Sequence, residues 1–241
     1  MQIKTRGIVL QSTDYSESSI VVKIYTEAGG MMSFMVNGVR TRNPRFPISL
    51  FQPFSIIELI ASGKPGNGML RLTEARLSPP LNGIATNMIK GTVALFLAEV
   101  IYRSVKEESP NPPLFGFLDN AIQVLDLPDT DCSRFHIYFL VRLARHLGIS
   151  PNGEFEPGVS IFDLREGLFR NDIPSYREYL SQKATARLHN LMNATFENYP
   201  DADISFGEMK ELLKGLVFYY ELHQTHGTAI RSHQVLEEIL Q

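Results

Sequence analysis

The sequence of 241 residues contains one cysteine, Cys132. A single cysteine excludes an internal disulfide and any zinc site built from several cysteines. The N-terminus, MQIKTRGIVL, lacks an apolar segment followed by a small-residue cleavage site, so no signal peptide is expected. The most apolar helical run, GTVALFLAEVIY, carries Glu99 and is shorter than the roughly 20 residues that span a bilayer. These absences predict a cytosolic protein without a membrane segment.

Catalytic and metal-binding motifs are missing as well. Cys132 and His136 are four residues apart on an expected helix, where a buried structural thiol is favoured over a nucleophilic pair. His223, His226 and His233 have no cysteine or acidic residue placed to complete a tetrahedral metal site. A favourable interaction of these histidines with a helix dipole is the preferred interpretation. The sequence therefore predicts a protein that is not an enzyme and that needs no cofactor or metal.

Charge is unevenly distributed along the chain. Residues 1–80 contain nine lysines and arginines against five acidic residues, a net charge of +4. The remaining residues contain 14 basic and 21 acidic side chains, a net charge of −7. Such asymmetry suggests an N-terminal part that binds a polyanion, joined to a part with another role.

Alternating apolar residues predict five β-strands before residue 78. The predicted runs are RGIVLQSTD (6–14), SSIVVKIYTE (18–27), MMSFMVNGV (31–39), FSIIELIAS (54–62) and MLRLTEARL (69–77). The glycines of EAGG (27–30) indicate a hairpin turn between the second and third strands. Five short strands joined by tight turns are typical of a small closed or partly open barrel.

The segment SPPLNG (78–83) ends the strands, and the hydrophobic period becomes helical after it. We predict an α+β protein with a barrel at 1–78 and a helical domain at 79–241. The expected helical runs are 84–108, 112–127, 131–148, 175–199, 205–224 and 232–240, with a non-helical loop at about 149–173 that includes at most a short hairpin. Ser205 and Glu208 predict a capping box.

The stretch NGVRTRNPRF (37–46) places Arg40, Arg42 and Arg45 within six residues, in a link whose prolines exclude a helix. By itself this stretch is more typical of a solvated connection. Single-strand binders built on small barrels combine a basic groove with aromatic residues that stack on bases. The candidate nucleic-acid contacts are therefore Arg40, Arg42, Arg45, Lys4, Arg6 and Lys23, with Tyr25, beside Lys23 on the more polar face of its strand, as the stacking residue.

Five segments, in order and across nearly the whole chain, resemble the RecO family of bacterial DNA repair proteins. The segments are GIVLQSTDYSESSIVVKIYTEAGGMMSFMVNGVR (7–40), LFQPFSIIEL (50–59), TEARLSPPL (73–81), RFHIYFLVRLARHLG (134–148) and IRSHQVLEEIL (230–240). The resemblance implies an N-terminal five-stranded OB-fold barrel followed by a C-terminal α-helical bundle.

The resemblance also implies a function without catalysis. Members of the family bind single- and double-stranded DNA, anneal complementary strands and help to load the recombinase RecA onto DNA coated by the single-stranded-DNA-binding protein. The implied partners are RecR, in some lineages RecF, and the acidic C-terminal tail of the coating protein, in a cytoplasmic, nucleoid-associated setting. Arg134 is the position implied for the tail, with Arg142 and Arg145 on the following turns. The alternative is a protein–protein adaptor with only indirect contact to DNA.

The sequence departs from the family in one region. Many members have a four-cysteine zinc module between the third and fourth helices, and residues 149–173 contain no cysteine. We therefore expect this loop to fold without zinc, around the apolar residues Phe155, Ile161, Phe162, Leu164 and Phe169.

Overall fold

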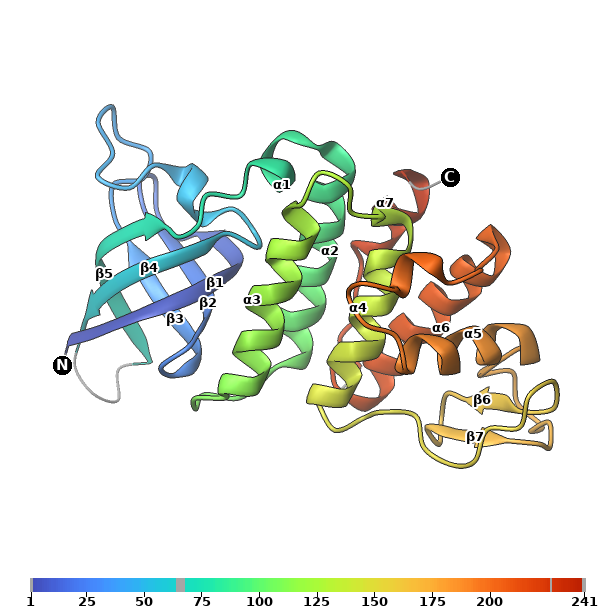
Figure 1. The fold of residues 1–241 in the computed structure, drawn as a ribbon. Helices are drawn as coiled ribbons and strands as arrows, with labels where there is room; N and C mark the ends of the chain where they lie inside the picture. The colour runs from blue at the N-terminus through green and yellow to red at the C-terminus, as the bar shows by residue number, and fades with distance from the viewer. Residues whose placement is uncertain (1, 64–67, 226, 240–241) are drawn as a thin grey trace. The chain divides into compact units, whose positions relative to one another are not determined.

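The computed structural model describes residues 2–63, 68–225 and 227–239 (Figure 1). Contacts between residues divide the chain into two compact units, Met1–Leu127 and Pro128–Gln241. The first unit holds the five-stranded barrel and three helices, and the second holds the remaining helices and a small sheet. The contacts therefore group the first three helices with the barrel, and the domain boundary after residue 78 stays a prediction. No helix in the described part of the chain has both the length and the apolar character needed to cross a membrane.

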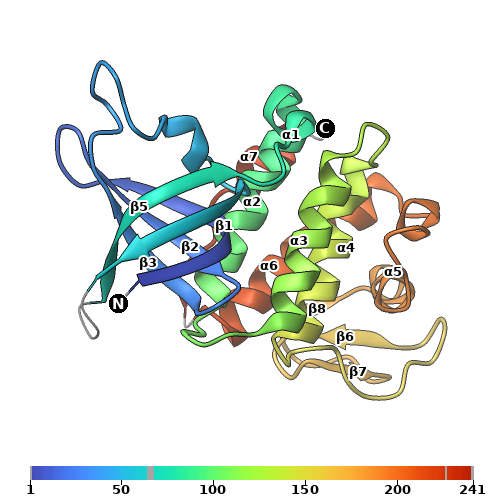
Figure 2. The ribbon, with the colours of Figure 1, turned by 60° about the vertical axis from the view of Figure 1, so that its left-hand side comes forward.

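Five strands form the closed barrel at the N-terminus, as predicted (Figure 2). They are β1 (Gln2–Asp14), β2 (Ile20–Thr26), β3 (Gly30–Val36), β4 (Ile56–Ser62) and β5 (Met69–Leu77). The order around the barrel is β1-β2-β3-β5-β4, and β4 pairs back onto β1. All pairings are antiparallel except that of β3 with β5. This closure is the OB-fold arrangement, and it confirms the fold class expected from the sequence.

The hairpin between β2 and β3 requires glycine at its end. Gly30 pairs with Thr26 and adopts a φ of 67°, a left-handed conformation that glycine adopts without strain. A Cβ atom at this position would lie 2.4 Å from the carbonyl oxygen of Glu107. The Glu107 oxygen also accepts a hydrogen bond of 2.8 Å from the backbone N–H of Met31. The turn predicted from EAGG is thus confirmed, and it also makes room for a neighbouring loop.

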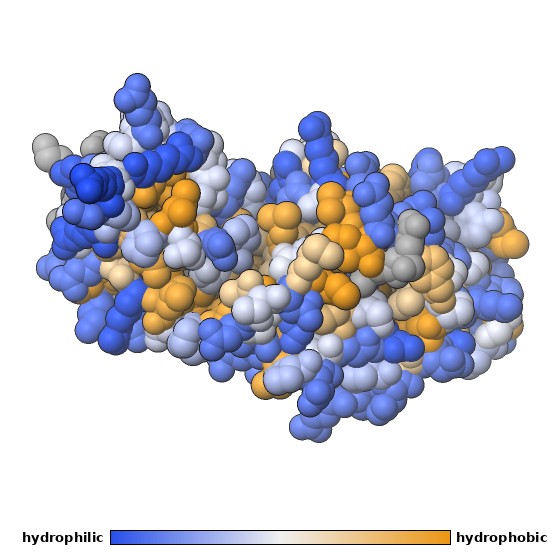
Figure 3. Space-filling model, turned by 90° about the horizontal axis from the view of Figure 1, so that it is seen from above, coloured by the Kyte–Doolittle hydropathy of each residue, from blue (hydrophilic) through white to orange (hydrophobic). Residues whose placement is uncertain are grey.

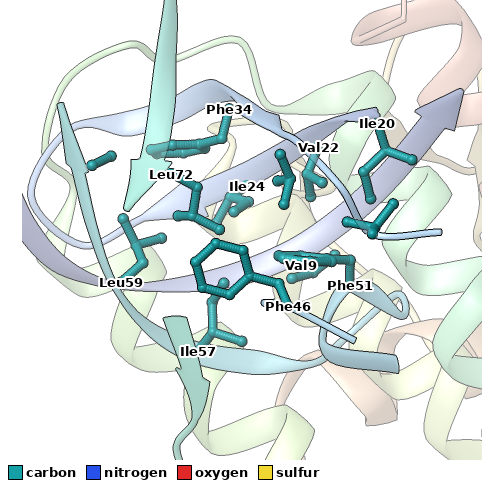
Figure 4. Packing of buried hydrophobic residues seen from close by; sticks show 13 residues of the cluster. Val9, Ile20, Val22, Ile24, Phe34, Phe46, Phe51, Ile57, Leu59 and Leu72 are labelled. Atoms are coloured by element: carbon teal, nitrogen blue, oxygen red, sulfur yellow. The ribbon is translucent and has the colours of Figure 1, made fainter. Parts of the chain in front are cut away.

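Side chains from all five strands fill the barrel interior, and two phenylalanines from the loop after β3 complete it. Figure 4 shows Phe46 and Phe51 pointing into the interior that also holds Val9 and Ile57. The two rings meet edge to face at 6.5 Å. Phe51 belongs to a four-residue 3-10 turn, η1 (Ile48–Phe51), which occupies the position between the third and fourth strands where OB folds usually have a helix. The prolines that excluded a longer helix are consistent with this short turn.

Three helices complete the first unit: α1 (Asn82–Thr86), α2 (Met88–Ser104) and α3 (Pro112–Asp126). Asn87 and Asn111 cap the N-termini of α2 and α3, and prolines occupy the first turn of α3. Lys90 of α2 is buried, and its Nζ donates to the backbone carbonyl oxygens of Asp126 and Leu127. This bond places a positive charge at the C-terminal end of α3, where the helix dipole favours it.

The described residues of the second unit form the helices α4 (Cys132–His146), α5 (Gln182–Met192), α6 (Phe206–His223) and α7 (His233–Ile239), and the 3-10 turn η2 (Tyr199–Asp201). Its small sheet has the order β7-β6-β8, formed by β6 (Ile161–Asp163), β7 (Leu168–Arg170) and β8 (Tyr179–Leu180). The capping box of Ser205 and Glu208 is confirmed, and so is the short hairpin, β6–β7, inside the loop expected at 149–173.

One predicted helix starts later than its sequence pattern suggested. The run 175–199 was expected to be helical, but Tyr179 and Leu180 pair with Asp163 and Phe162 as a third strand. Ser181 then caps α5, accepting a hydrogen bond from the backbone N–H of Ala184. Pairing with β6 satisfies backbone groups that a helix would otherwise satisfy, so tertiary contacts overrode the local pattern.

Candidate nucleic-acid interface

The arginine-rich loop after β3 is fixed at both ends and open in the middle. Val39 and Phe46 are buried, whereas residues 40–43 and Arg45 are exposed. The backbone N–H of Val39 donates to the carbonyl oxygen of Ser18 at 2.9 Å, which anchors the loop to the β1–β2 connection. In Figure 3, hydrophilic side chains gather over the barrel at the left of the view. The loop therefore presents Arg40, Arg42 and Arg45 to solvent from a well-anchored base.

The three arginines differ in their partners. Arg40 forms an ion pair with Asp14, the last residue of β1. The guanidinium of Arg45 lies 5.4 Å from the centre of the Phe46 ring, an arrangement that leaves its hydrogen-bond donors available. Arg42 is exposed at the middle of the loop. A planar guanidinium is suited to bidentate contact with phosphate, so the loop has the chemistry expected for a polyanion.

Tyr25 does not lie on an open polar face, and that part of the sequence prediction is wrong. Its side chain is 0% exposed, and its ring stacks on Phe115 of α3 at 6.3 Å. Its hydroxyl has no hydrogen-bond partner in the described part of the chain. Burial, together with the nearby charge of Glu107, raises the pKa of Tyr25 to about 12. The ring is covered because α3 packs on the outer side of β2, which strand alternation cannot reveal.

Arg6 of β1 also contacts α3. One guanidinium nitrogen lies 2.6 Å from a carboxylate oxygen of Asp119 on α3. The guanidinium also lies 5.6 Å from the centre of the Phe115 ring. Arg6 therefore fastens α3 to the barrel, and its charge is already balanced.

The remaining predicted cations lie on different strands. Lys4 is exposed on β1 and lines a shallow groove with Glu58, Glu74 and Arg76 of β4 and β5. Lys23 is half-buried on β2, opposite Ser33. The acidic residues beside Lys4 reduce the positive potential there, so the arginine loop is the strongest basic feature among the predicted contacts.

The sequence interpretation missed Arg71 of β5. When the Asn37 amide is assigned from its hydrogen-bonding neighbours, its oxygen accepts from Nε and Nη2 of Arg71, at 3.3 and 2.6 Å. Arg71 thereby holds the first residue of the arginine-rich loop. The sequence shows only that Arg71 is one of two arginines in the fifth apolar run, which carries no information about this partner.

The three arginines predicted for a protein partner lie along α4. Arg134 is partly exposed and bonded at 2.5 Å to Asp131, whose side chain caps the helix. Arg142 is half-buried and reaches the carbonyl oxygen of Met192 at 3.5 Å, and Arg145 is exposed. With about 1.5 Å of rise per residue, Arg134 and Arg145 are about 16 Å apart along the helix axis. One terminal carboxylate therefore cannot contact both.

A mainly apolar pocket opens between α4, α6 and α7. Its lining residues are Ser133, His136, Phe206, Met209, Lys210, Leu213 and Glu237. Phe206 is half exposed, whereas His136 is buried. Burial lowers the pKa of His136 to about 4, so this imidazole is neutral at pH 7. The pocket thus combines an apolar floor with the charged ends of Lys210 and Glu237.

The region without cysteines folds around aromatic side chains, as expected. Ile161, Phe162, Leu164 and Phe169 are buried, and Phe155 is half-buried. The Phe155 ring stacks on His189 of α5 at 4.1 Å and meets Phe169 at 5.6 Å. Among the described residues no group of three or more His, Cys, Asp or Glu side chains could hold a metal ion, and His226 lies outside those residues.

The first unit is thus an OB-fold barrel with a basic loop, the architecture of an oligonucleotide-binding module. Comparison with known families identifies the chain further. Residues 1–80 match the family described as "Recombination protein O N terminal", and residues 85–229 match "Recombination protein O C terminal". The chain belongs to this family, the RecO family of DNA repair and recombination proteins.

Curated relatives match over almost their full lengths. A protein of Phocaeicola vulgatus named DNA repair protein RecO is 35% identical over 236 residues, 98% of each chain. Proteins of the same name from Bacteroides fragilis and Flavobacterium johnsoniae are 34% and 33% identical over 237 and 240 residues, covering 98% and 99% of each chain.

Proposed function

We propose that this protein is a non-catalytic mediator of recombinational repair that binds single- and double-stranded DNA through the loop carrying Arg40, Arg42 and Arg45. The observation that carries the proposal is the exposure of three arginines on one anchored loop of an OB-fold barrel. Most of the affinity would come from neutralising phosphates, which needs no base-specific contact. Duplex and single strands can both satisfy such a site.

DNA binding of this kind also supports annealing. A protein that neutralises phosphates on two complementary strands reduces the repulsion between them and permits pairing. We propose that the protein anneals strands in this way, and that it helps a recombinase to load on strands covered by the single-stranded-DNA-binding protein. The implied protein partners are RecR, RecA and, in some lineages, RecF, at the nucleoid.

The test of DNA binding is a charge reversal in the loop. Replacing Arg40, Arg42 and Arg45 with glutamate should weaken binding of a labelled single strand at least tenfold at low salt, measured by fluorescence anisotropy. The slope of log K against log salt should also decrease by about 2, because each single-strand phosphate contributes about 0.7. Circular dichroism and thermal melting should match the parent, since these side chains lie outside the core.

A matched variant controls for total charge. Lys106, Arg177 and Lys183 are exposed, and replacing all three with glutamate changes the net charge by the same amount. This variant should bind the labelled strand like the parent. An equal loss of DNA affinity in both variants would show that only the total charge matters. Tight DNA binding by the variant without the three loop arginines would show that the loop is not the DNA-binding site.

The second candidate function is a protein–protein adaptor that contacts DNA only through partners. The net charge of −7 on the residues after 80 favours it, because that surface repels DNA. Purified protein and bare oligonucleotide without partners separate the two functions. A complete absence of binding at low salt would favour the adaptor.

We propose that the acidic C-terminal tail of the single-stranded-DNA-binding protein binds this protein at α4. Arg134 offers a guanidinium near the N-terminus of α4, and the pocket beginning at the adjacent Ser133 offers apolar surface with Lys210. Basic and apolar groups together suit a short acidic peptide with hydrophobic side chains.

Strand annealing tests this partner. The Arg134→Glu variant should anneal bare complementary strands at the parental rate but lose at least about half of the rate on strands coated by the single-stranded-DNA-binding protein. Arg177→Glu, at an exposed arginine outside the residues implied for the tail, is the matched control. Equal rates for Arg134→Glu and the parent on coated strands would exclude Arg134 from the site.

A further inference from the structure

Tyr15 is the exposed aromatic residue of the barrel. Its side chain is 64% exposed, in the connection between β1 and β2. The other aromatic residues of the barrel segment are all at most 6% exposed: Tyr25, Phe34, Phe46, Phe51 and Phe54. These five rings support the core or the packing of a helix, whereas the ring of Tyr15 supports neither. A single exposed aromatic side chain is common on protein surfaces, so the significance of Tyr15 depends on the residues beside it.

Three contacts join the β1–β2 connection, which carries Tyr15, to the arginine-rich loop. The backbone N–H of Val39 donates to the Ser18 carbonyl oxygen at 2.9 Å. Asp14, adjacent to Tyr15 in the chain, holds the guanidinium of Arg40. These contacts place the aromatic residue beside the arginines, although the two segments are separated in sequence by an entire hairpin.

The third contact extends this arrangement to β5. With the amide of Asn37 assigned from its neighbours, its nitrogen donates to Ser19 Oγ at 3.2 Å and its oxygen accepts from Arg71. Ser19 thereby connects the Tyr15 connection to the start of the arginine loop, and Arg71 fixes Asn37 from the sheet. The Tyr15 backbone N–H donates to the Ser19 carbonyl oxygen at 3.0 Å, which closes the turn that carries the tyrosine. The base of the turn is therefore fixed while the ring remains exposed.

We propose that Tyr15 stacks on an unpaired base of a single strand whose phosphates are bound by Arg40, Arg42 and Arg45. Arginines hold the sugar–phosphate backbone without regard to strandedness, whereas an aromatic face adds affinity only where a base is free to stack on it. Tyr15 thus makes the site prefer single strands over duplex. The proposal rests on the proposed DNA binding and assigns the stacking contact that Tyr25 cannot make.

A tryptophan substitution gives a direct optical test, because the chain contains no tryptophan. The Tyr15→Trp variant should show strong quenching of its single indole when oligo(dT) is added, and little quenching with a duplex of equal length. Ile173→Trp is the control, since Ile173 is 70% exposed and lies in residues 128–241. Its indole should be unaffected by either ligand.

Affinity measurements provide the second test. Tyr15→Ala should weaken binding of oligo(dT) at least about fivefold, with a clearly smaller effect on duplex, and Tyr15→Phe should restore the affinity because the ring is retained. Tyr25→Phe should bind oligo(dT) as tightly as the parent, because the ring of Tyr25 is buried against Phe115.

The outcomes separate this inference from the proposed function. If the parent binds oligo(dT) and Tyr15→Ala binds it equally well, or if the Tyr15→Trp indole is not quenched, the stacking contact is excluded while the arginine site stands. If the parent fails to bind any oligonucleotide at low salt, the proposed function itself fails. Equal loss of single-strand and duplex affinity in Tyr15→Ala would also contradict stacking, and would indicate that the turn only supports the arginine loop.

Discussion

Asp163 is a buried carboxylate at the end of β6. Its side chain is 0% exposed and accepts hydrogen bonds from the backbone N–H groups of Arg165 and Glu166, at 2.9 and 3.2 Å. Arg170 donates to one of its oxygens at 3.0 Å, and the hydroxyl of Tyr176 donates to the same oxygen at 2.5 Å. Burial alone would raise the pKa of Asp163, but these hydrogen bonds outweigh it and hold the pKa below its usual range.

We predict that Asp163→Asn destabilises the protein by about 3 kcal/mol at pH 7, because it removes the negative charge from a buried ion pair. Urea unfolding followed by circular dichroism measures the change. Asp172→Asn is the matched control, since Asp172 also pairs with Arg170 but its side chain is 70% exposed. The control should unfold like the parent.

The same residue has a defined pH dependence. Because the folded-state pKa lies below the unfolded-state value of about 4, the charged form stabilises the folded protein above that pH. The contribution is lost as the pH decreases through the folded-state pKa. The difference in the free energy of unfolding between the parent and Asp163→Asn should therefore become smaller below about pH 4. A difference that stays constant down to pH 2.5 would contradict this account.

The outer face of the barrel is an element-scale feature with its own burial pattern. Ile56, Ile8 and Tyr25 form a row across β4, β1 and β2, and all three are at most 1% exposed. Helix α2 packs on β1, and Phe115 of α3 covers Tyr25. Both faces of β1 are consequently buried near its middle, as in a strand between two layers.

This packing predicts which fragment folds by itself. Residues 1–127 should be soluble and should unfold cooperatively, because α1 to α3 remain to cover the outer row. Residues 1–80, which end before these helices, would expose Ile8, Leu10 and Tyr25 to water and leave Arg6 without Asp119. We expect this shorter fragment to aggregate or to show no cooperative transition in urea. A cooperative transition with the midpoint of the longer fragment would show that the helices do not support the barrel.

At the scale of the whole molecule, basic and acidic residues are distributed unequally between the barrel segment and the later segments. The segment that forms the barrel carries the excess of basic residues, and the segments that follow carry the acidic excess. We therefore expect the proposed DNA binding on the barrel, because the acidic excess of the later segments repels a polyanion. The proposed function therefore assigns DNA to the barrel segment and leaves the acidic segments for protein partners.

Several features followed from the sequence alone. Alternation with a period of two located all five strands, and β5 has the predicted limits, Met69–Leu77. Glycine at residue 30 and the Ser205–Glu208 pair specified a turn and a helix start, because each depends on atoms within a few residues. The apolar residues expected to replace zinc do form the core of their region.

Other features were decided only by the tertiary structure. Alternation tells which side chains share a face of a strand, but it does not tell which outer faces a later helix will cover. Tyr25 and Arg6 were therefore assigned to an open surface, although Phe115 and Asp119, some 90 or more residues further along the chain, bury one and neutralise the other. The position of Tyr15 beside the arginine loop likewise depends on backbone contacts across a hairpin. Local pattern determined the elements, and long-range packing determined which of their residues remain free to bind.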